Sequence, residues 1–332
     1  MCSMPVKMRL TSVFALCLSI VPAGCAGLGK SGQTILVPQI EGHWWQVAGN
    51  PDLGQFTSVN QEPVDFAVWQ AADGTWQLWS CIRNTKCGGR TRLFYRWEGK
   101  KLTDPNWQPM GIAMQADTAL GEQQGGLQAP HVIKVGDIYY MFYGDWERIC
   151  LAASKDGKQF DRVLNERGQP DLFFGPYENT RDAMVLKSCG LYFCYYTGHL
   201  PEDSPQKHKS AVFCRTSSDL EKWSEPVKVS AGGSPARVSV WQGGNAECPF
   251  VVEMDGLYCL FRNQLYGGNN INTQYCSPNP LAFGVDDDSY MTGTLAVAAP
   301  EIIEHNGRYY IAALMPNLKG IRIAKLKWLP KK

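Results

Sequence analysis

Short runs of β-branched and aromatic residues alternate with polar turns along the chain, and one version of this pattern occurs five times. In each copy, an apolar run of five or six residues leads into a glycine-containing turn, and a second apolar run follows. Asp-Gly and Asn-Gly turns between such runs indicate β-hairpins, because glycine and asparagine tolerate positive φ. The pattern predicts five hairpins, over residues 64–79, 129–143, 181–196, 247–261 and 299–311.

The spacing of the hairpins predicts the architecture. Their turns follow one another at intervals of 63, 53, 66 and 51 residues, which leaves room for one four-stranded blade in each interval. Long helical periodicity is absent from the sequence. We therefore predict an all-β fold, a five-bladed β-propeller over residues 41–330. A β-sandwich array and a solenoid are the alternatives, but closure into a ring protects strand edges better.

The first residues have the pattern of a targeting segment. Lys7 and Arg9 precede an apolar run from Leu10 to Val21, which is too short to span a membrane. We predict a lipoprotein-type signal peptide over residues 1–24, followed by a linker over residues 25–40.

Small residues precede Cys25, as they do in the lipobox of bacterial lipoproteins. Pro22 stands where those proteins usually carry Leu or Val, so ordinary cleavage after Ala23 or Ala26 is the alternative. Either process exports the mature protein, as a periplasmic or cell-surface lipoprotein attached to the membrane through a lipidated Cys25, or as a secreted protein.

Cysteine content and charge limit the remaining possibilities. Nine of the 12 cysteines follow the apolar run and Cys25, and an exported compartment permits disulfides. Cys81 and Cys87 flank a short loop and are candidates to pair, and no Cys or His spacing suits zinc. The 32 basic residues balance 31 acidic ones, which gives no sign of a nucleic-acid partner.

Acidic residues recur where the predicted inner strands begin. In a propeller, these first residues face the mouth of the central channel, and three hairpins carry an acid there: Asp65, Asp182 and Glu247. Acids are poor strand residues, so three of them converging on one channel favour chemistry over the capping of strand ends. Glycoside hydrolysis needs one protonated and one ionised carboxyl group, and crowded carboxylates push each other's pKa values apart.

Two of these acids stand in motifs that resemble known glycosidases. Arg181-Asp182, followed by a small residue, resembles the Arg-Asp-Pro motif of the invertase-like family 32 enzymes, and Glu247-Cys248-Pro249 resembles their Glu-Cys-Pro motif. Asp65 opens the first blade strand, where those enzymes and the related family 43 arabinanases and xylosidases keep an Asp. The Ala-Pro strand starts and the Tyr-Tyr pairs after the turns are likewise similar to family 43. The resemblance extends from Gln61 to Leu326.

The resemblance implies a role for each acid. Asp65 is the general base or nucleophile, Asp182 stabilises the transition state or modulates a pKa, and Glu247 is the general acid. The chain departs from the family patterns at two positions. Phe66 follows Asp65 where those families have Pro, and Ala183 follows Asp182 where the Arg-Asp-Pro motif has Pro.

Asp52 is a rival acid of the first blade, but no strand follows it directly. His131 takes the place of an acid of many family 43 members, and it resembles the His of propeller hydrolases that act on agar oligosaccharides. It is interpreted as a ligand of a sugar hydroxyl, with a proton donor or a packed core residue as alternatives.

Further substrate-binding residues are predicted by type, as aromatic platforms for sugar rings or as charged groups that orient acids and hydroxyls: Arg181, Trp69, Trp146, Trp241, Arg262 and Glu301. The basic cluster of the first-blade loop is interpreted as solvated, with a subsite for an acidic or sulfated sugar as the less favoured interpretation: Arg83, Lys86, Arg90 and Arg92.

These features predict an exported glycosidase acting on plant or algal oligo- or polysaccharides, with a carbohydrate as its partner and no cofactor. No convincing channel metal site is identified. A non-catalytic carbohydrate-binding propeller is the alternative, and a propeller lyase is a third possibility that would need a Tyr/His or metal arrangement instead.

Overall fold

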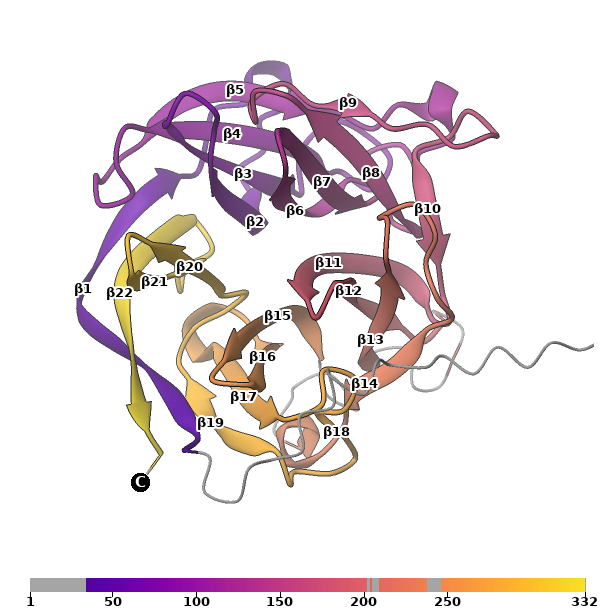
Figure 1. Cartoon of the computed structure of the whole chain (residues 1–332). Helices are drawn as coiled ribbons and strands as arrows, with labels where there is room; N and C mark the ends of the chain where they lie inside the picture. Colours follow the sequence, from indigo (N-terminus) through magenta and orange to yellow (C-terminus); the bar gives the residue numbers. More distant parts are fainter. Residues whose placement is uncertain (1–33, 202–203, 205–208, 238–245, 332) are drawn as a thin grey trace, which may run out of the picture.

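Five mainly antiparallel β-sheets surround a central axis in the computed structural model, which describes residues 34–331 apart from 202–203, 205–208 and 238–245 (Figure 1). The predicted signal peptide and Cys25 lie outside the described residues. Each of the five predicted hairpins forms the two inner strands of one sheet. The prediction of a five-bladed β-propeller is therefore confirmed.

The blades are numbered along the chain, and the strands of each are given from the channel outward. Blade 1 contains β2 (Glu62–Gln70), β3 (Trp76–Arg83), β4 (Leu93–Gly99) and β5 (Gln108–Met114). Blade 2 contains β6 (Gln128–Val135), β7 (Ile138–Gly144), β8 (Arg148–Ser154) and β10 (Asp171–Phe174), with β9 (Asp161–Arg162) also paired to β8. Blade 3 contains β11 (Glu178–Ser188), β12 (Leu191–His199), β13 (Ser210–Ser217), β14 (Val227–Ala231) and β18 (Gly284–Val285).

Blade 4 contains β15 (Glu247–Met254), β16 (Leu257–Leu265), β17 (Ile271–Ser277) and β19 (Met291–Leu295). Blade 5 contains β20 (Glu301–His305), β21 (Arg308–Leu314), β22 (Gly320–Pro330) and β1 (Leu36–Gly49). Within the described part of the chain, the helical elements are four short 3-10 turns: η1 (Gly54–Phe56), η2 (Thr118–Leu120), η3 (Ser234–Arg237) and η4 (Gly267–Asn269).

The two ends of the described chain close the ring. Strand β1 pairs antiparallel with β22, from Leu36 opposite Pro330 to Gly49 opposite Gly320. Figure 1 shows this pair as the indigo and yellow strands of one blade. Residues 36–40, which we expect to be linker, therefore already belong to blade 5, and the propeller begins a few residues earlier than the sequence suggests.

Aromatic side chains fill the space between neighbouring blades. Trp69 and Trp79 of blade 1 pack against Phe160 of blade 2, with ring centroids 5.9 and 5.3 Å from that of Phe160. Such large buried rings supply much of the apolar area that holds a propeller together.

A disulfide joins Cys259 to Cys276, which face each other across β16 and β17. The expected pairing of Cys81 with Cys87 is wrong. The buried Cys81 thiol instead donates to the carbonyl of Leu127, and Cys87 donates to the carbonyl of Arg92.

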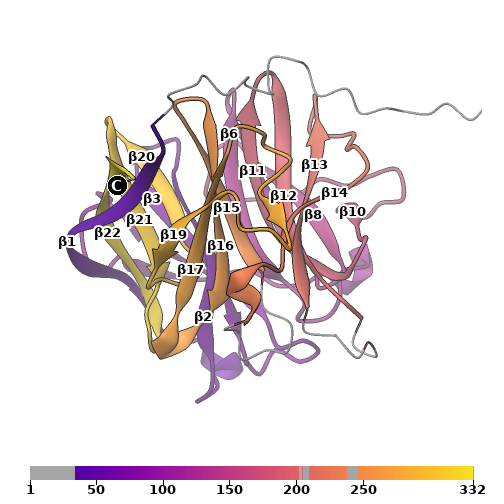
Figure 2. The same ribbon diagram turned by 90° about the horizontal axis from the view of Figure 1, so that it is seen from below.

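The inner strands share a backbone irregularity near their starts. At corresponding positions of the five hairpins, at or just before the start of the inner strand, one residue has a positive φ: Asp65 (36°), Ala129 (41°), Asp182 (57°), Cys248 (45°) and Ala299 (45°). In blades 1 to 4 the register with the second strand shifts around this residue, which marks a β-bulge. A bulge bends the strand and re-aims side chains. The inner strands run through the thickness of the ring (Figure 2), so the bulges surround the channel.

Candidate active site

The shared bulge places the three predicted catalytic acids around the channel. Asp65 and Asp182 occupy the bulge position itself, and Cys248 is the equivalent residue of blade 4. Glu247 stands one residue earlier, where blade 3 has Arg181. The three acids are therefore close in space. The hairpin pattern suggested that they hold equivalent positions, but Glu247 is one residue out of step with the other two.

Two residues connect the acids. Cys248 lies between Asp65 and Asp182: its thiol donates to Asp65 Oδ1 at 3.3 Å, and its backbone N–H donates to Asp182 Oδ2 at 3.2 Å. Arg181 lies between the other two, since its Nη2 donates to Glu247 Oε1 at 2.6 Å and its Nε is 3.5 Å from Asp182 Oδ1. The three carboxyl groups, one thiol and one guanidinium thus form a single connected cluster.

The cluster pushes two of the carboxyl groups in opposite directions. Burial, together with the negative charges of Asp65 and Glu247, raises the pKa of Asp182 to about 6, although Arg181 and the Cys248 N–H oppose the rise. Burial also acts to raise the pKa of Glu247, but Arg181, His199 and Tyr266 outweigh it and hold that pKa below its ordinary value. Neighbouring carboxyls with separated pKa values are typical of sites for acid–base chemistry.

Two further side chains complete the surroundings of Glu247. His199, at the end of β12, has its Nε2 2.7 Å from Glu247 Oε1 and 2.8 Å from Arg181 Nη2. Tyr266 follows β16, and its hydroxyl is 3.1 Å from Cys248 Sγ. The sequence pattern did not select Tyr266, because it lies beyond the hairpin that carries the motif.

A cleft with a volume of about 1240 Å³ opens over this cluster. Asp65, Glu247, Arg181, His199 and Tyr266 line it, so two of the three acids are accessible to a molecule in the cleft. The cleft continues over residues of blades 2 and 3, including Trp146, Arg148 and Tyr177. A volume of this size accommodates a ligand larger than one sugar ring.

Asp182 lies beneath the cleft and is 4% exposed. It lines a separate cavity of about 40 Å³ further along the channel, together with His131 and Glu301. Asp182 is therefore placed to influence the two accessible acids through its own charge, rather than to contact a ligand in the cleft.

The structure brings His131 and Glu301 to the inner cavity and not to the cleft. They hold equivalent positions, two residues after the residue with positive φ in blades 2 and 5. Burial lowers the pKa of His131 to about 4, so the imidazole is neutral, with its Nε2 3.4 Å from the Val185 carbonyl. Burial raises the pKa of Glu301 well above its ordinary value, although the Val68 N–H donates to it.

The remaining predicted binding residues fall in different places. Trp146 lines the cleft, in the turn between β7 and β8. Trp69 does not reach it, because its ring is buried between blades 1 and 2 and its indole N–H donates to the Gly157 carbonyl. Arg262 is 1% exposed and donates to Ser230 Oγ and the Gly232 carbonyl, away from the acids. Trp241 lies outside the described residues.

Asp52 is not part of the cluster. Its carboxylate is exposed and caps its own loop, where it accepts from the Gly54 N–H and the Thr57 hydroxyl. Asp65, and not Asp52, is therefore the blade 1 acid that faces the channel.

Two structural features are absent from the described residues. Over residues 34–331 without the three gaps, no three His, Cys, Asp or Glu side chains are grouped so that they could hold a metal ion. In the same part of the chain, no helix has the length and apolar character needed to cross a membrane.

Comparison with known proteins identifies the fold. No protein-family model and no curated protein matches the sequence. Among solved structures, a thermostable family 43 glycoside hydrolase is similar with a TM-score of 0.61 and 17% identity, over 83% of this chain and 92% of that one. An endo-arabinase from Bacteroides thetaiotaomicron is similar with a TM-score of 0.60 and 15% identity, over 84% and 97% of the two chains.

A third similar structure is a family 43 β-xylosidase/α-arabinofuranosidase from a compost microbial metagenome, in complex with xylotriose. Its TM-score is 0.56 and its identity 15%, over 88% of this chain and 96% of that one. The chain therefore has the five-bladed fold found in family 43 glycosidases, over nearly the whole length of those structures.

Proposed function

We propose that this protein is an exported glycoside hydrolase that cleaves glycosidic bonds in plant or algal oligo- or polysaccharides. One observation carries the proposal: Asp65 and Glu247 line the same cleft and are coupled through Cys248, Arg181 and the buried Asp182. The reaction needs two carboxyl groups that flank the scissile bond, and the presence of both acids in one cleft supports these roles for them. The likeness of the fold to family 43 glycosidases supports the same reaction class.

In the proposed reaction, Asp65 acts as the general base or nucleophile and Glu247 protonates the leaving oxygen. Asp182 sets the electrostatics from below. When the Asp182 carboxyl group is neutral, it adds no negative charge to those of Asp65 and Glu247. When Asp182 ionises, its charge opposes the ionisation of the other two acids.

The general acid has to carry a proton when the sugar is bound. In the substrate-free cleft, Arg181 and His199 favour the ionised form of Glu247. His199 Nε2, 2.7 Å from Glu247 Oε1, is the neighbouring group that can exchange a proton with it. We propose that a sugar in the cleft excludes water and drives this exchange, so that Glu247 and His199 act as a pair.

The test combines two substitutions with two kinds of substrate. A screen of aryl glycosides and of plant and algal polysaccharides first identifies a substrate. Asp65→Asn is then expected to abolish hydrolysis of every substrate found. Glu247→Gln is expected to abolish hydrolysis of the polysaccharide but to retain activity on a dinitrophenyl glycoside, whose leaving group departs without protonation.

Glu253→Gln is the matched control for Glu247→Gln, because Glu253 lies on the same strand and is exposed. It is expected to leave kcat/KM unchanged. Near-normal hydrolysis by Asp65→Asn contradicts the proposal. Sugar binding without hydrolysis by the wild-type protein, on every substrate of the screen, supports the alternative of a non-catalytic carbohydrate-binding propeller.

Export remains a proposal that rests on the sequence of residues 1–24 and is supported by the Cys259–Cys276 disulfide, since disulfides persist in oxidising compartments. If Cys25 is lipidated, Cys25→Ser moves the protein from the membrane fraction to the soluble exported fraction. Fractionation of cells that express both forms measures this. An unchanged distribution contradicts lipid attachment.

A further inference from the structure

The lining of the cleft is rich in arginine. Seven arginines line the cleft: Arg83, Arg90, Arg92, Arg148, Arg167, Arg181 and Arg215. Four of them form ion pairs with Asp or Glu at 2.5 to 2.7 Å, namely Arg83, Arg148, Arg167 and Arg181. Arg215 is held by neutral oxygens, those of Tyr196, Ser224 and Phe174.

Arg90 and Arg92 are different. Among the residues that the structure describes, no carboxylate lies within ion-pair distance of either guanidinium. Both guanidiniums lie over the ring of Trp146, with their central carbons 4.5 and 5.0 Å from the ring centroid. Two positive charges beside one ring repel each other, and an anion bound next to them offsets that repulsion.

The backbone that carries the two arginines is fixed. Arg90 N–H donates to the Gln124 carbonyl and Arg92 N–H to the Gly125 carbonyl, both at 2.9 Å. Gly89 has a φ of 53°, and a side chain there would collide with the Gln124 carbonyl. The loops around residues 88–92 and 124–126 are therefore locked together, so binding an anion here requires ordering of side-chain tips only.

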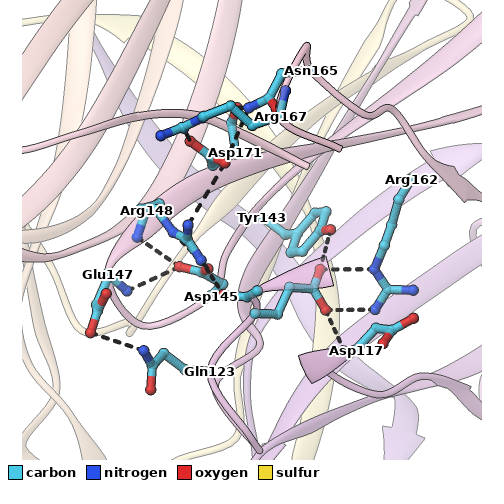
Figure 3. A network of polar contacts seen from close by, with 12 residues as sticks. Asp117, Gln123, Tyr143, Asp145, Glu147, Arg148, Arg162, Asn165, Arg167 and Asp171 are labelled. Carbon is cyan, nitrogen blue, oxygen red and sulfur yellow. Dashed lines mark hydrogen bonds and ion pairs between the residues drawn. The ribbon is translucent and has the colours of Figure 1, made fainter. Parts of the chain in front are cut away.

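The ring beneath the guanidiniums is also held in place. Trp146 has a φ of 87°, a conformation that bulky residues rarely adopt. The turn is maintained by Asp145, whose carboxylate accepts from the N–H groups of Glu147 and Arg148 and from the Arg148 guanidinium. Figure 3 shows this network, with Glu147 bonded to Gln123 at its edge.

We propose that Arg90, Arg92 and Trp146 form a subsite for an anionic substituent, a carboxylate or a sulfate ester, on the sugar chain whose cleavage is proposed above. Trp146 serves as a plate that positions the guanidiniums. The Arg92 side chain also bonds the Cys81 thiol, and the remaining N–H groups of the two arginines can donate to anionic oxygens. Contact with the ring face uses none of the guanidinium N–H groups, and the planar fork of these groups matches carboxylate and sulfate oxygens. This inference rests on the proposed function, since it assigns the substrate class of the same cleft.

The test measures binding to two matched pairs of ligands by titration calorimetry. One pair is xylotriose and xylotriose carrying one glucuronosyl residue. The other is a sulfated carrageenan-derived tetrasaccharide and its desulfated form. All measurements use full-length Asp65→Asn protein to prevent turnover, with Arg90→Gln/Arg92→Gln as the variant. The control is Arg96→Gln, since Arg96 lies on β4 outside the cleft and donates to the Lys158 carbonyl.

The charged member of at least one pair is expected to bind about tenfold more tightly than its neutral partner, and that pair identifies carboxylate or sulfate as the substituent. The advantage is expected to fall below about threefold in Arg90→Gln/Arg92→Gln and to persist in Arg96→Gln. Unchanged affinity for the neutral sugar shows that the variant is folded.

Equal affinity for charged and neutral members in both pairs overturns the proposal, as does an advantage that survives in the double variant. These results are independent of turnover. Hydrolysis of neutral aryl glycosides with no preference for an anion upholds the proposed function and rejects the subsite. If anion binding depends on the two arginines but the wild-type protein hydrolyses no substrate of the screen, the subsite is upheld and the proposed function is rejected.

Discussion

Substituting Asp182 by Asn should make the protein more stable while it makes the proposed enzyme inactive. Asp182 is buried beneath the cleft, and its pKa is raised to about 6 from an ordinary value of 3.8. A carboxyl group whose pKa is raised in the folded state opposes folding whenever it is ionised. This is the reverse of the usual effect of a paired carboxylate, and Asn removes it because the amide does not ionise.

The magnitude follows from the two pKa values. A difference of about two units corresponds to about 3 kcal/mol. This unfavourable contribution is absent below about pH 3.8, grows as the pH rises and is complete above about pH 6. Asp182→Asn is thus expected to gain about 3 kcal/mol in free energy of unfolding at pH 8, and about 1 kcal/mol at pH 4.5. The Arg181 attraction is already included, because it acts against the rise.

Urea denaturation at the two pH values measures the effect, provided that the m-value does not change. Asp73→Asn is the control with the opposite sign. Asp73 is an exposed acid of blade 1 whose pKa is lowered by Lys158 and Thr75, so its substitution removes a favourable interaction at neutral pH. A gain for Asp182→Asn that is equal at both pH values, or a loss at pH 8, would refute this account of the site.

Two further predictions concern the framework. Cys259→Ser/Cys276→Ser is expected to lower the free energy of unfolding by about 3 kcal/mol, since the disulfide closes a loop of 17 residues. Thermal melts with and without reductant measure this loss. A wild-type melting temperature that does not change on complete reduction contradicts the prediction. Tyr143→Phe is expected to cost about 1.5–3 kcal/mol, because the buried Tyr143 hydroxyl donates to Glu122 at 2.6 Å. Tyr139→Phe on the same strand is the control, because the Tyr139 hydroxyl has no hydrogen bond to a described residue. Equal losses in the two variants speak against a role for the contact between Tyr143 and Glu122.

Much of the fold could be predicted because short patterns of neighbouring residues determine it. The five hairpins combine a turn signal with two apolar runs, and both depend on residues close in sequence. The closing strand β1 has no such partner nearby. Its pairing with β22 joins residues nearly 300 positions apart, as with Leu36 and Pro330, and no local signal encodes a contact of that kind. Residues 36–40 were therefore predicted to be part of a linker.

The site was harder to predict than the fold for two physical reasons. A bulge shifts which side chain faces the channel by one residue, and alignment on the turns does not detect it. Glu247 and Asp182 consequently seemed equivalent, although Cys248 is the true counterpart of Asp182. In addition, residue type does not show on which side of a blade a side chain lies: Trp69 and Trp146 are both tryptophans, yet one fills the core and the other faces the cleft.

The five residues with positive φ at the starts of the hairpins form a ring of corresponding positions around the channel. The backbone fixes the direction of each side chain there, so the identity of the residue can change without new scaffolding. Two of the five positions, Ala129 and Ala299, carry only a methyl group, and both line the inner cavity. Asp and Asn adopt positive φ more readily than Ala. Single substitutions at these two alanines would therefore add a fourth or fifth functional group to the same ring, which makes this propeller a natural starting point for the design of new catalysts.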